Sequence, residues 1–346
     1  MSAVLVTGGS GMLGANLVRR LHADGYEVTS VDLRDPERPL PGVRYRRGDV
    51  RDTAAMERAA AGAEAVVHTA AALPTYSAGQ IRDIIVGGTT GVLSAAHRAG
   101  VARVVHVSST AVYGLPDVVP TTEDHPRRPV DAYSAAKAEA EQVCERFRAR
   151  GLCVPVLRPK TFLGPGRMGL FAMLFEWAEE GRHFPVIGRG DVRIQMLAVD
   201  DLVDAIRTAL TAPADVADDT YNIAAAEFAT LRQDFQAVLD AAGHGRRVIA
   251  VPAAPAVAVL GLLQRARLSP VYGRLLHKLL ADSYVSIDKA RDRLGFTPQH
   301  SNRDAILRTY EWWREQRAAA AGPAAAGRTS QDPWRQGALR LAKVLF

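Results

Sequence analysis

The stretch from Val4 to Gly14, VLVTGGSGMLG, constrains the fold more than any other part of the chain. Its hydrophobic start predicts a short buried strand, and a helix is expected to begin at Met12. Between them, one glycine permits a tight turn, a second lets the backbone approach a ligand, and a third lets the helix pack on the sheet. These glycines are Gly8, Gly11 and Gly14. The order of strand, turn and helix predicts a dinucleotide site with its pyrophosphate at the helix N-terminus.

Strands and helices alternate through the first half of the chain. The segment Tyr26–Val31 predicts the second strand, and Ala65–His68 and Val104–Val107 predict later strands that are hydrophobic, as is typical of a parallel sheet covered on both faces. Alanine-rich segments, Thr53–Ala61 and Thr89–Ala99, predict intervening helices. The sequence therefore predicts an α/β fold, a Rossmann-type doubly wound parallel sheet with right-handed crossovers.

An acidic residue closes the second predicted strand and indicates which dinucleotide is bound. Asp32 lies 18 residues past Gly14, where a carboxylate can accept hydrogen bonds from the adenosine ribose and repels a 2′-phosphate. NAD is therefore favoured over NADP, although Arg34 could partly offset this preference. In the pentapeptide 48–52, Asp49 could accept from the adenine amino group while Val50 packs on the ring; an ordinary loop is the alternative for this segment.

Tyr133 and Lys137 lie four residues apart at the start of a predicted helix that runs to about Arg150. They share one helical face, at the carboxyl edge of the sheet where such folds bind ligands. A free tyrosine has a pKa near ~10, and a neighbouring ammonium favours the phenolate. Tyr133 can then serve as general base for a substrate hydroxyl, and Ser109 can orient that hydroxyl.

Several motifs in order resemble the extended short-chain dehydrogenase/reductases of the NAD-dependent epimerase/dehydratase family, over residues 3 to about 313. The resemblance rests on TGGSGMLG at 7–14, VDLR at 31–34, GDVRD at 48–52, HTAA at 68–71, VSSTAVYG at 107–114, YSAAK at 133–137, LRPKTFLGPG at 157–166 and VDDLVDAI at 199–206. It implies Ser109, Tyr133 and Lys137 as the catalytic group, Thr69 and Ala70 beside the nicotinamide, and a homodimer. The cofactor residues expected on this basis are Gly8, Gly11, Met12, Leu13, Gly14, Asp32, Leu33, Arg34, Asp49, Val50, Thr69, Ala70, Ala71, Tyr133 and Lys137.

Departures from the family pattern narrow the reaction. Sugar-nucleotide 4,6-dehydratases carry an Asp-Glu pair where this chain has Thr110 and Ala111, so dehydration is disfavoured. Thr161 stands where related epimerases have an asparagine, and Ile85 replaces another. Thr110, Lys160, Thr161 and Arg193 are the expected substrate residues. Lys160 and Arg193 could serve an anion or be ordinary surface charges.

Three functions follow from this pattern. The first is an NAD-dependent epimerase acting on a sugar, expected to be a nucleotide-sugar, through a transient keto intermediate. The second is a dehydrogenase of the 3β-hydroxysteroid type on an apolar substrate, because the segments 168–177 and 256–280 are rich in apolar residues. A non-catalytic NAD-binding regulator is the third, and the intact Ser109, Tyr133 and Lys137 set argues against it.

The 346 residues allow a second, smaller unit. We expect an NAD-binding domain at 1–165 with returning segments near 196–225, and a mostly helical substrate domain at 166–195 and 226–317. Its predicted helices are Met168–Gly181, Leu231–Ala241, Pro255–Leu263 and Asn302–Ala318. Residues 318–346 are expected to form a linker and an amphipathic tail, and 334–346 could contact an anionic membrane surface.

Composition excludes several classes of protein. The chain is 48% hydrophobic with a net charge of +6, and its basic residues are scattered apart from clusters such as 44–47, so no nucleic-acid partner is expected. Cys144 and Cys153 lack metal-ligand spacing, so no metal is expected. They also make no disulfide framework, so a reducing, cytoplasmic location is expected. No signal peptide is apparent, and the longest apolar run is too short to span a bilayer.

Overall fold

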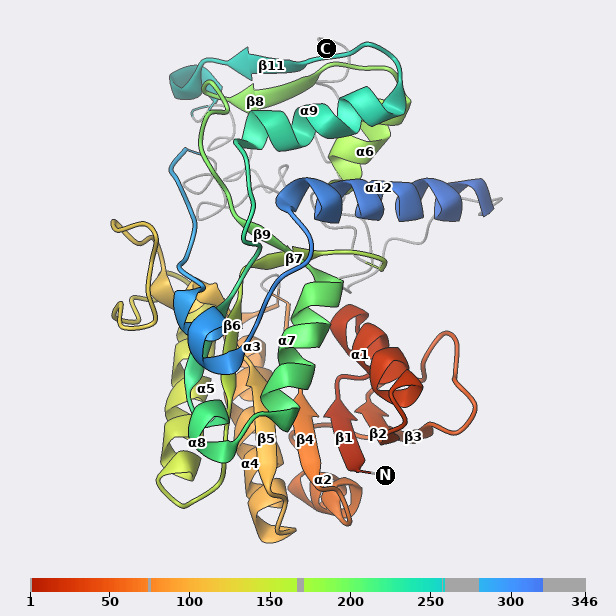
Figure 1. The fold of residues 1–346 in the computed structure, drawn as a ribbon, viewed down its shortest axis with the longest axis vertical. Coiled ribbons are helices and arrows are strands. Elements are labelled where there is room, and N and C mark those ends of the chain that lie inside the picture. Colours follow the sequence, from red (N-terminus) through yellow and green to blue (C-terminus); the bar gives the residue numbers. More distant parts are fainter. Residues whose placement is uncertain (1, 74–75, 167–170, 257, 259–279, 320–346) are drawn as a thin grey trace.

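The computed structural model describes residues 2–73, 76–166, 171–256, 258 and 280–319. Seven parallel strands form its central sheet (Figure 1). In spatial order they are β10 (Thr220–Ile223), β6 (Val156–Pro159), β5 (Arg103–Val107), β4 (Ala65–His68), β1 (Ala3–Thr7), β2 (Glu27–Asp32) and β3 (Arg44–Arg47). The chain winds outward from β1 in both directions, which confirms the predicted doubly wound sheet. Such a sheet binds its ligand at the carboxyl ends of β1 and β4, where the winding reverses.

Each face of the sheet is covered by its own set of helices. In β1, Val4 and Val6 point to one face and Leu5 to the other, as the two-residue period of a strand requires. The first face packs on α1 (Met12–Ala23), α7 (Val199–Thr211) and η3 (Ala290–Leu294). The second packs on α2 (Thr53–Ala60), α4 (Gly88–Arg98) and α5 (Ala132–Arg148). Burial on both faces explains why central strands such as β1 and β4 are mostly hydrophobic, whereas the edge strand β3 is not.

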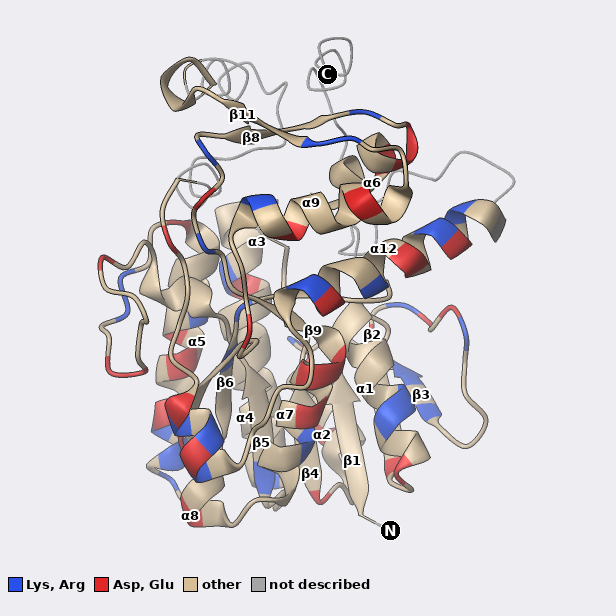
Figure 2. Cartoon of the chain, turned by 45° about the horizontal axis from the view of Figure 1, so that its top comes forward, with Lys and Arg blue, Asp and Glu red and all other residues tan. Residues whose placement is uncertain are grey.

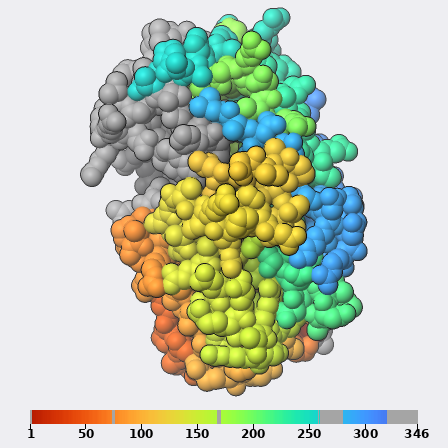
Figure 3. Space-filling model, turned by 90° about the vertical axis from the view of Figure 1, so that its left-hand side faces the viewer, coloured from red at the N-terminus to blue at the C-terminus, as the bar shows by residue number. Residues whose placement is uncertain are grey.

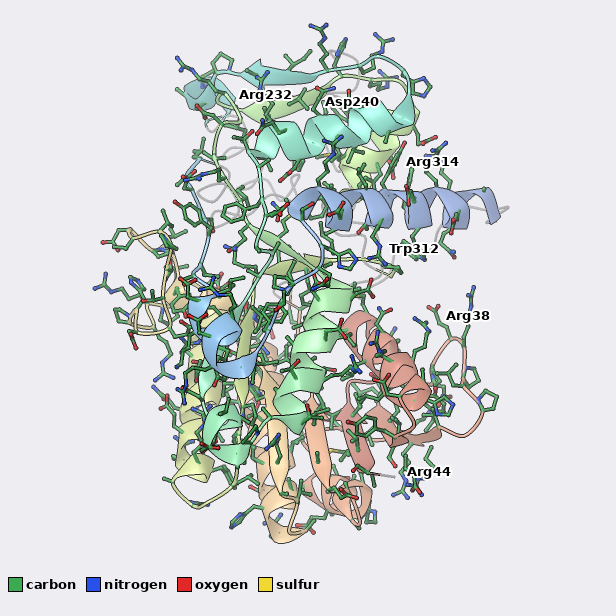
Figure 4. The ribbon with its side chains drawn as sticks, viewed as in Figure 1. Arg38, Arg44, Arg232, Asp240, Trp312 and Arg314 are labelled. Carbon is green, nitrogen blue, oxygen red and sulfur yellow. The ribbon has the colours of Figure 1, made fainter. Side chains whose placement is uncertain are left out.

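A second unit lies beyond the carboxyl edge of the sheet, at the top of Figure 1. It contains α6 (Phe171–Glu179), α9 (Leu231–Ala242), α12 (Asn302–Ala319), and the parallel pair β8 (Phe184–Ile187) and β11 (Val248–Val251). Its core is aromatic and includes Trp177, Phe235, Tyr310 and Trp313. Arg314 of α12, labelled in Figure 4, pairs with Glu179 of α6 at 2.9 Å. The β8–β11 pair was not predicted, because four-residue strands do not show a clear period.

The two units meet where β7 (Thr161–Leu163) pairs with β9 (Met196–Ala198) and α7 begins. Asp201, 1% exposed, accepts the backbone N–H groups of Gln299 and His300, each at 3.0 Å. Arg308 of α12 pairs with Asp200 at 2.7 Å. Figure 2 shows this acidic start of α7 beside α12. The acidic first turn therefore holds the second unit over the sheet.

Several boundaries differ from the sequence-based expectation. The predicted helix 89–99 is α4, and it continues from α3 (Ala78–Arg82) through a wide turn, the π-helix η1 (Asp83–Gly87). The turn Thr110–Tyr113 is a 3₁₀ helix, η2, and Ala214–Ala217 forms the short α8. Such short elements have no periodic signature. The predicted helix 255–263 lies mostly outside the described residues, and the tail 334–346 wholly so.

The basic cluster 44–47 lies on the edge strand β3. Arg44, labelled in Figure 4, pairs with Glu27 at 3.4 Å, and Arg47 pairs with Asp35. Acidic neighbours thus partly neutralise this cluster. Among the described residues, no helix combines the length and apolarity needed to cross a membrane.

Candidate active site

The glycine turn after β1 is packed too closely for any larger residue at two positions. Gly8 has φ +75°, and a Cβ there would lie 2.7 Å from the backbone N of Ala70. A Cβ on Gly14 would lie 2.1 Å from the carbonyl oxygen of Gly8. Gly11 is the N-cap of α1 and has no side chain that could fill the space before the helix. The turn therefore leaves a backbone-lined cradle at a helix N-terminus, which suits a pyrophosphate.

This cradle opens into a crevice of about 710 Å³ along the carboxyl edge of the sheet. Its volume is within the range of cofactor and substrate sites. Apart from Arg193, every predicted site residue lines it: Gly8, Gly11, Met12, Leu13, Gly14, Asp32, Leu33, Arg34, Asp49, Val50, Thr69, Ala70, Ala71, Ser109, Thr110, Tyr133, Lys137, Lys160 and Thr161. The structure thus brings together residues that are up to 153 positions apart, from Gly8 to Thr161.

Asp32 is fixed at the rim of the cradle by backbone groups. Its carboxylate accepts the N–H of Ser10 at 3.0 Å and the N–H of Arg34 at 3.2 Å. The hydroxyl of Ser10 in turn donates to the carbonyl of Arg34 at 2.8 Å. These bonds orient the carboxylate at the place where the sequence predicts the adenosine ribose.

Asp49 is also held, but by a side chain that the sequence did not single out. Arg51 donates to Asp49 Oδ2 at 2.6 Å and to Asp83 Oδ2 at 2.6 Å. The Arg51 guanidinium holds the pKa of Asp49 below its usual range. An adenine amino group at Asp49 would therefore share this carboxylate with Arg51. No motif indicated this bridge, because Asp83 belongs to η1, 32 residues further on.

The predicted catalytic group lies at the other end of the crevice. Asp131 and Ser134 form a capping box that begins α5, so Tyr133 and Lys137 project from its first two turns. Lys137 is 3% exposed and its ammonium donates to the carbonyl of Val107 at 2.8 Å. Burial lowers the pKa of Lys137 to about 8. Ser109, the N-cap of η2, accepts the N–H of Ala111 at 3.1 Å.

The expected substrate residues divide into two groups. Thr110 donates to the carbonyl of Pro159 at 3.3 Å, and Lys160, 6% exposed, donates to Ser283 Oγ at 2.8 Å. Thr161 lines the crevice beside them. Arg193 is not among the described lining residues. Its guanidinium instead reaches the Tyr284 hydroxyl at 3.0 Å and lies 3.6 Å from Asp282.

Sequence reasoning missed a set of apolar residues that line the same crevice as Lys160. The crevice is also lined by Ala72, Leu73, Tyr76, Ile84 and Phe162. The first four come from the segment between β4 and α4, which carries no recognised motif. No regular spacing of apolar residues after the HTAA stretch marks these positions in the sequence.

A buried histidine pair lies beneath the catalytic group. His68 bonds to the Thr7 hydroxyl at 2.7 Å and to the Thr89 hydroxyl at 3.2 Å, and its ring centroid is 5.5 Å from that of His106. Burial, together with Lys137, lowers the pKa of His68 to about 3 and that of His106 well below its usual value. Both rings are therefore neutral supports at physiological pH.

The fold and the crevice define a dinucleotide-binding enzyme with a tyrosine and lysine pair, the extended short-chain dehydrogenase/reductase type. The model of the NAD dependent epimerase/dehydratase family matches residues 4–224. The chain belongs to this family. The family resemblance, the enzyme class and the NAD cofactor predicted from the sequence are thereby confirmed.

Relatives within the family have different activities. The chain is 34% identical to the uncharacterized protein y4nG of Sinorhizobium fredii, over 92% of this chain and 80% of that one. It is 30% identical to a 3 beta-hydroxysteroid dehydrogenase/Delta 5-->4-isomerase of Mycobacterium tuberculosis, over 88% of this chain and 89% of that one. The structure of UDP-glucose 4-epimerase from Thermotoga maritima with UDP-glucose shares the fold, with a TM-score of 0.76 and 24% sequence identity. The match covers 91% of this chain and 99% of that one.

Proposed function

We propose that this protein is an epimerase that oxidises a secondary alcohol of a sugar, a nucleotide-sugar in particular, and re-reduces the ketone on its opposite face. The observation that carries the proposal is the convergence of Ser109, Tyr133 and Lys137 in the crevice that begins at the glycine cradle. Thr110 and Ala111 supply no carboxylate beside them, so the site is equipped for hydride and proton transfer but not for loss of water.

The cradle, Asp32 and the crevice would hold NAD, with the pyrophosphate over Gly8–Gly14 and the ribose at Asp32. NAD supplies the hydride acceptor and donor when bound. Tyr133, as phenolate, would take the proton of the substrate hydroxyl at its Oη. Ser109 holds the substrate oxygen, and the Lys137 ammonium stabilises the phenolate. The same groups return the proton when the ketone is reduced.

Lys160 supports a polar or anionic substrate. Lys160 lines the crevice, and its almost fully buried ammonium donates to Ser283 Oγ at 2.8 Å, so a positive charge borders the proposed substrate region. Arg193 remains a proposed anion contact only if the Asp282 and Tyr284 contacts open.

The second candidate is a dehydrogenase of the 3β-hydroxysteroid type. The observation that favours it is the wall of Ala72, Leu73, Tyr76, Ile84 and Phe162, which suits an apolar ring system. The relative of Mycobacterium tuberculosis has this activity by name. A homodimer and a cytoplasmic location also remain proposals.

One assay separates the two candidates. The purified protein with NAD is given UDP-glucose in one arm and a 3β-hydroxysteroid in the other, and both product and NADH absorbance are followed. The epimerase proposal expects a stereoisomeric sugar with no net NADH. Stoichiometric NADH from the steroid arm, with an unchanged sugar, would overturn it in favour of the second candidate. Mass spectrometry of a ligand that co-purifies with the native protein would identify the substrate directly.

A further inference from the structure

Glu141 is a buried carboxylate that the proposed chemistry does not use. It lies on α5, eight residues after Tyr133 and four after Lys137, and is 2% exposed. Its Oε1 accepts the hydroxyl of Ser108 at 2.6 Å and Nε of Arg158 at 2.9 Å. Its Oε2 accepts Nη2 of Arg158 at 2.7 Å and Nη1 of Arg127 at 3.3 Å. One carboxylate therefore receives four donors inside the protein.

These donors come from the segments that carry the active-site residues. Ser108 directly precedes Ser109 at the end of β5, and Arg158 lies in β6, two residues before Lys160. Arg158 continues the network by donating to the Tyr113 hydroxyl at 2.8 Å. The Glu141 carboxylate thus joins α5 to two neighbouring strand ends of the same crevice.

Solvent is kept from this network by the segment between β5 and α5. Figure 3 shows that segment, in yellow, over the upper end of α5. Arg127 comes from it and bridges Glu141 to the half-exposed Glu145, 2.8 Å from Arg127 Nη1. A buried ion pair of this kind adds little net stability compared with apolar packing. Its place beside the active site suggests another purpose.

Lys137 lies four residues before Glu141 on the same face of α5, and both side chains are buried. Burial lowers the pKa of Lys137, and the Glu141 carboxylate acts against this effect. The other charged or titratable groups around Lys137 and Glu141 are Tyr133 in the crevice, Cys144 on α5, His68 and His106 on the strands, and the two arginines on the Glu141 carboxylate, Arg158 and Arg127. Cys144 and the two histidines are neutral, since burial raises the pKa of Cys144 to about 12 and lowers those of the histidines.

We propose that Glu141 is a positioning residue of the active site, whose buried carboxylate holds Lys137 in its ammonium form from behind the crevice. The proposal rests on the proposed function only in giving Lys137 a catalytic role. Without Glu141, no carboxylate beside Lys137 would offset the burial of its ammonium, and a neutral amine could not stabilise a phenolate. The carboxylate acts through Lys137 and does not touch the substrate.

The chain has five lysines, so the titration of Lys137 can be followed directly by NMR of protein labelled at the lysine ε positions. Lys137→Met identifies its signal. Glu141→Gln removes the charge while keeping the shape, and we expect the Lys137 titration to move to lower pH than in the wild type. No substrate is needed, so the result is independent of whether the enzyme is an epimerase or a dehydrogenase.

Glu145→Gln is the matched control, because it removes the other α5 carboxylate that contacts Arg127. It should leave the Lys137 titration where the wild type has it. The proposal is overturned if both variants titrate alike at the wild-type pH. A shift in Glu141→Gln alone supports it, and turnover assays then report separately on the proposed function.

Removing Glu141 alone leaves Arg158 without its charge partner and could prevent folding. The double variant Glu141→Gln with Arg158→Gln avoids this, because Arg127 keeps Glu145. The double variant also lacks the carboxylate four residues after Lys137, so it should show the same downward movement. A folded double variant with the wild-type titration would equally contradict the proposal.

Discussion

The two ends of the crevice are built in different ways. The end expected to hold the cofactor is shaped mainly by backbone atoms. Gly8 and Gly14 leave no room for a Cβ, and main-chain N–H groups fix the Asp32 carboxylate. At the substrate end, side chains from distant segments meet, such as Tyr76, Lys160 and Ser283. A backbone site accepts one ligand and tolerates little change, whereas a side-chain site can be altered for another substrate. This contrast fits a family that keeps NAD and varies its reaction.

Tyr133→Phe should give the largest effect and would separate chemistry from cofactor binding. The variant keeps the ring but loses the proton acceptor, so turnover should fall by about 10²-fold or more while NAD affinity changes little. Tyr45→Phe is the control. It removes a hydroxyl on β3 that accepts the N–H of Leu40, and it should retain activity. Wild-type turnover in Tyr133→Phe would remove the basis of the assignment.

The pH dependence of stability tests the burial of Lys137. Its pKa is about 8 in the folded protein and about 10.4 in an unfolded chain. Between these values the unfolded chain binds more protons, so the free energy of unfolding rises with pH. Relative to Lys137→Met, the wild type should gain up to about 3 kcal/mol from pH ~7 to ~10.5, measured by urea unfolding. A constant difference across that range would show that Lys137 is not held as the structure describes; Lys289→Met is the control.

Gly14→Ala probes the cofactor end. The new Cβ would lie 2.1 Å from the Gly8 carbonyl, and backbone cannot move aside cheaply. We expect a loss of about 1–3 kcal/mol in the free energy of unfolding and at least a tenfold weaker NAD affinity by calorimetry. Gly79→Ala, on α3 with nothing within 4 Å of the new Cβ, should bind NAD normally. Equal behaviour of the two variants would mean that the turn is not the cradle.

Lys160→Met tests the end of the crevice expected to hold the substrate, and its expected effect on the enzyme is the smallest of the four variants. It should raise the substrate KM by about tenfold, as expected for one lost contact to a charged group, and leave NAD affinity unchanged. Arg193→Met, outside the described crevice lining, should change KM much less. The reverse order would place the substrate's anion at Arg193.

The contrast also explains what could be predicted from the sequence. The glycine end of the crevice depends on local patterns, such as the glycine spacing at 8–14 and Asp32 at the end of β2, so residues that line it could be named in advance. The doubly wound sheet followed from continuously hydrophobic strands such as Ala65–His68. These features are repeated or contiguous in the chain.

The substrate end could not be read in this way. Ser283 contacts Lys160 although the two are 123 positions apart. Arg51 contacts Asp83, which lies in the π-helix η1, and no sequence periodicity predicts that helix. Arg193 looked suitable by its place before α7, yet its guanidinium lies against Tyr284 and Asp282. Contacts between distant segments depend on how the second unit settles on the sheet, and local sequence does not encode that placement.

A crystal structure of the protein with NAD tests the central claim most directly. The account predicts the pyrophosphate over Gly8–Gly14 at the start of α1, the adenosine ribose at Asp32, and the nicotinamide beside Tyr133 and Lys137. A dinucleotide bound with its nicotinamide away from those two side chains, or lying outside the glycine turn, would contradict it.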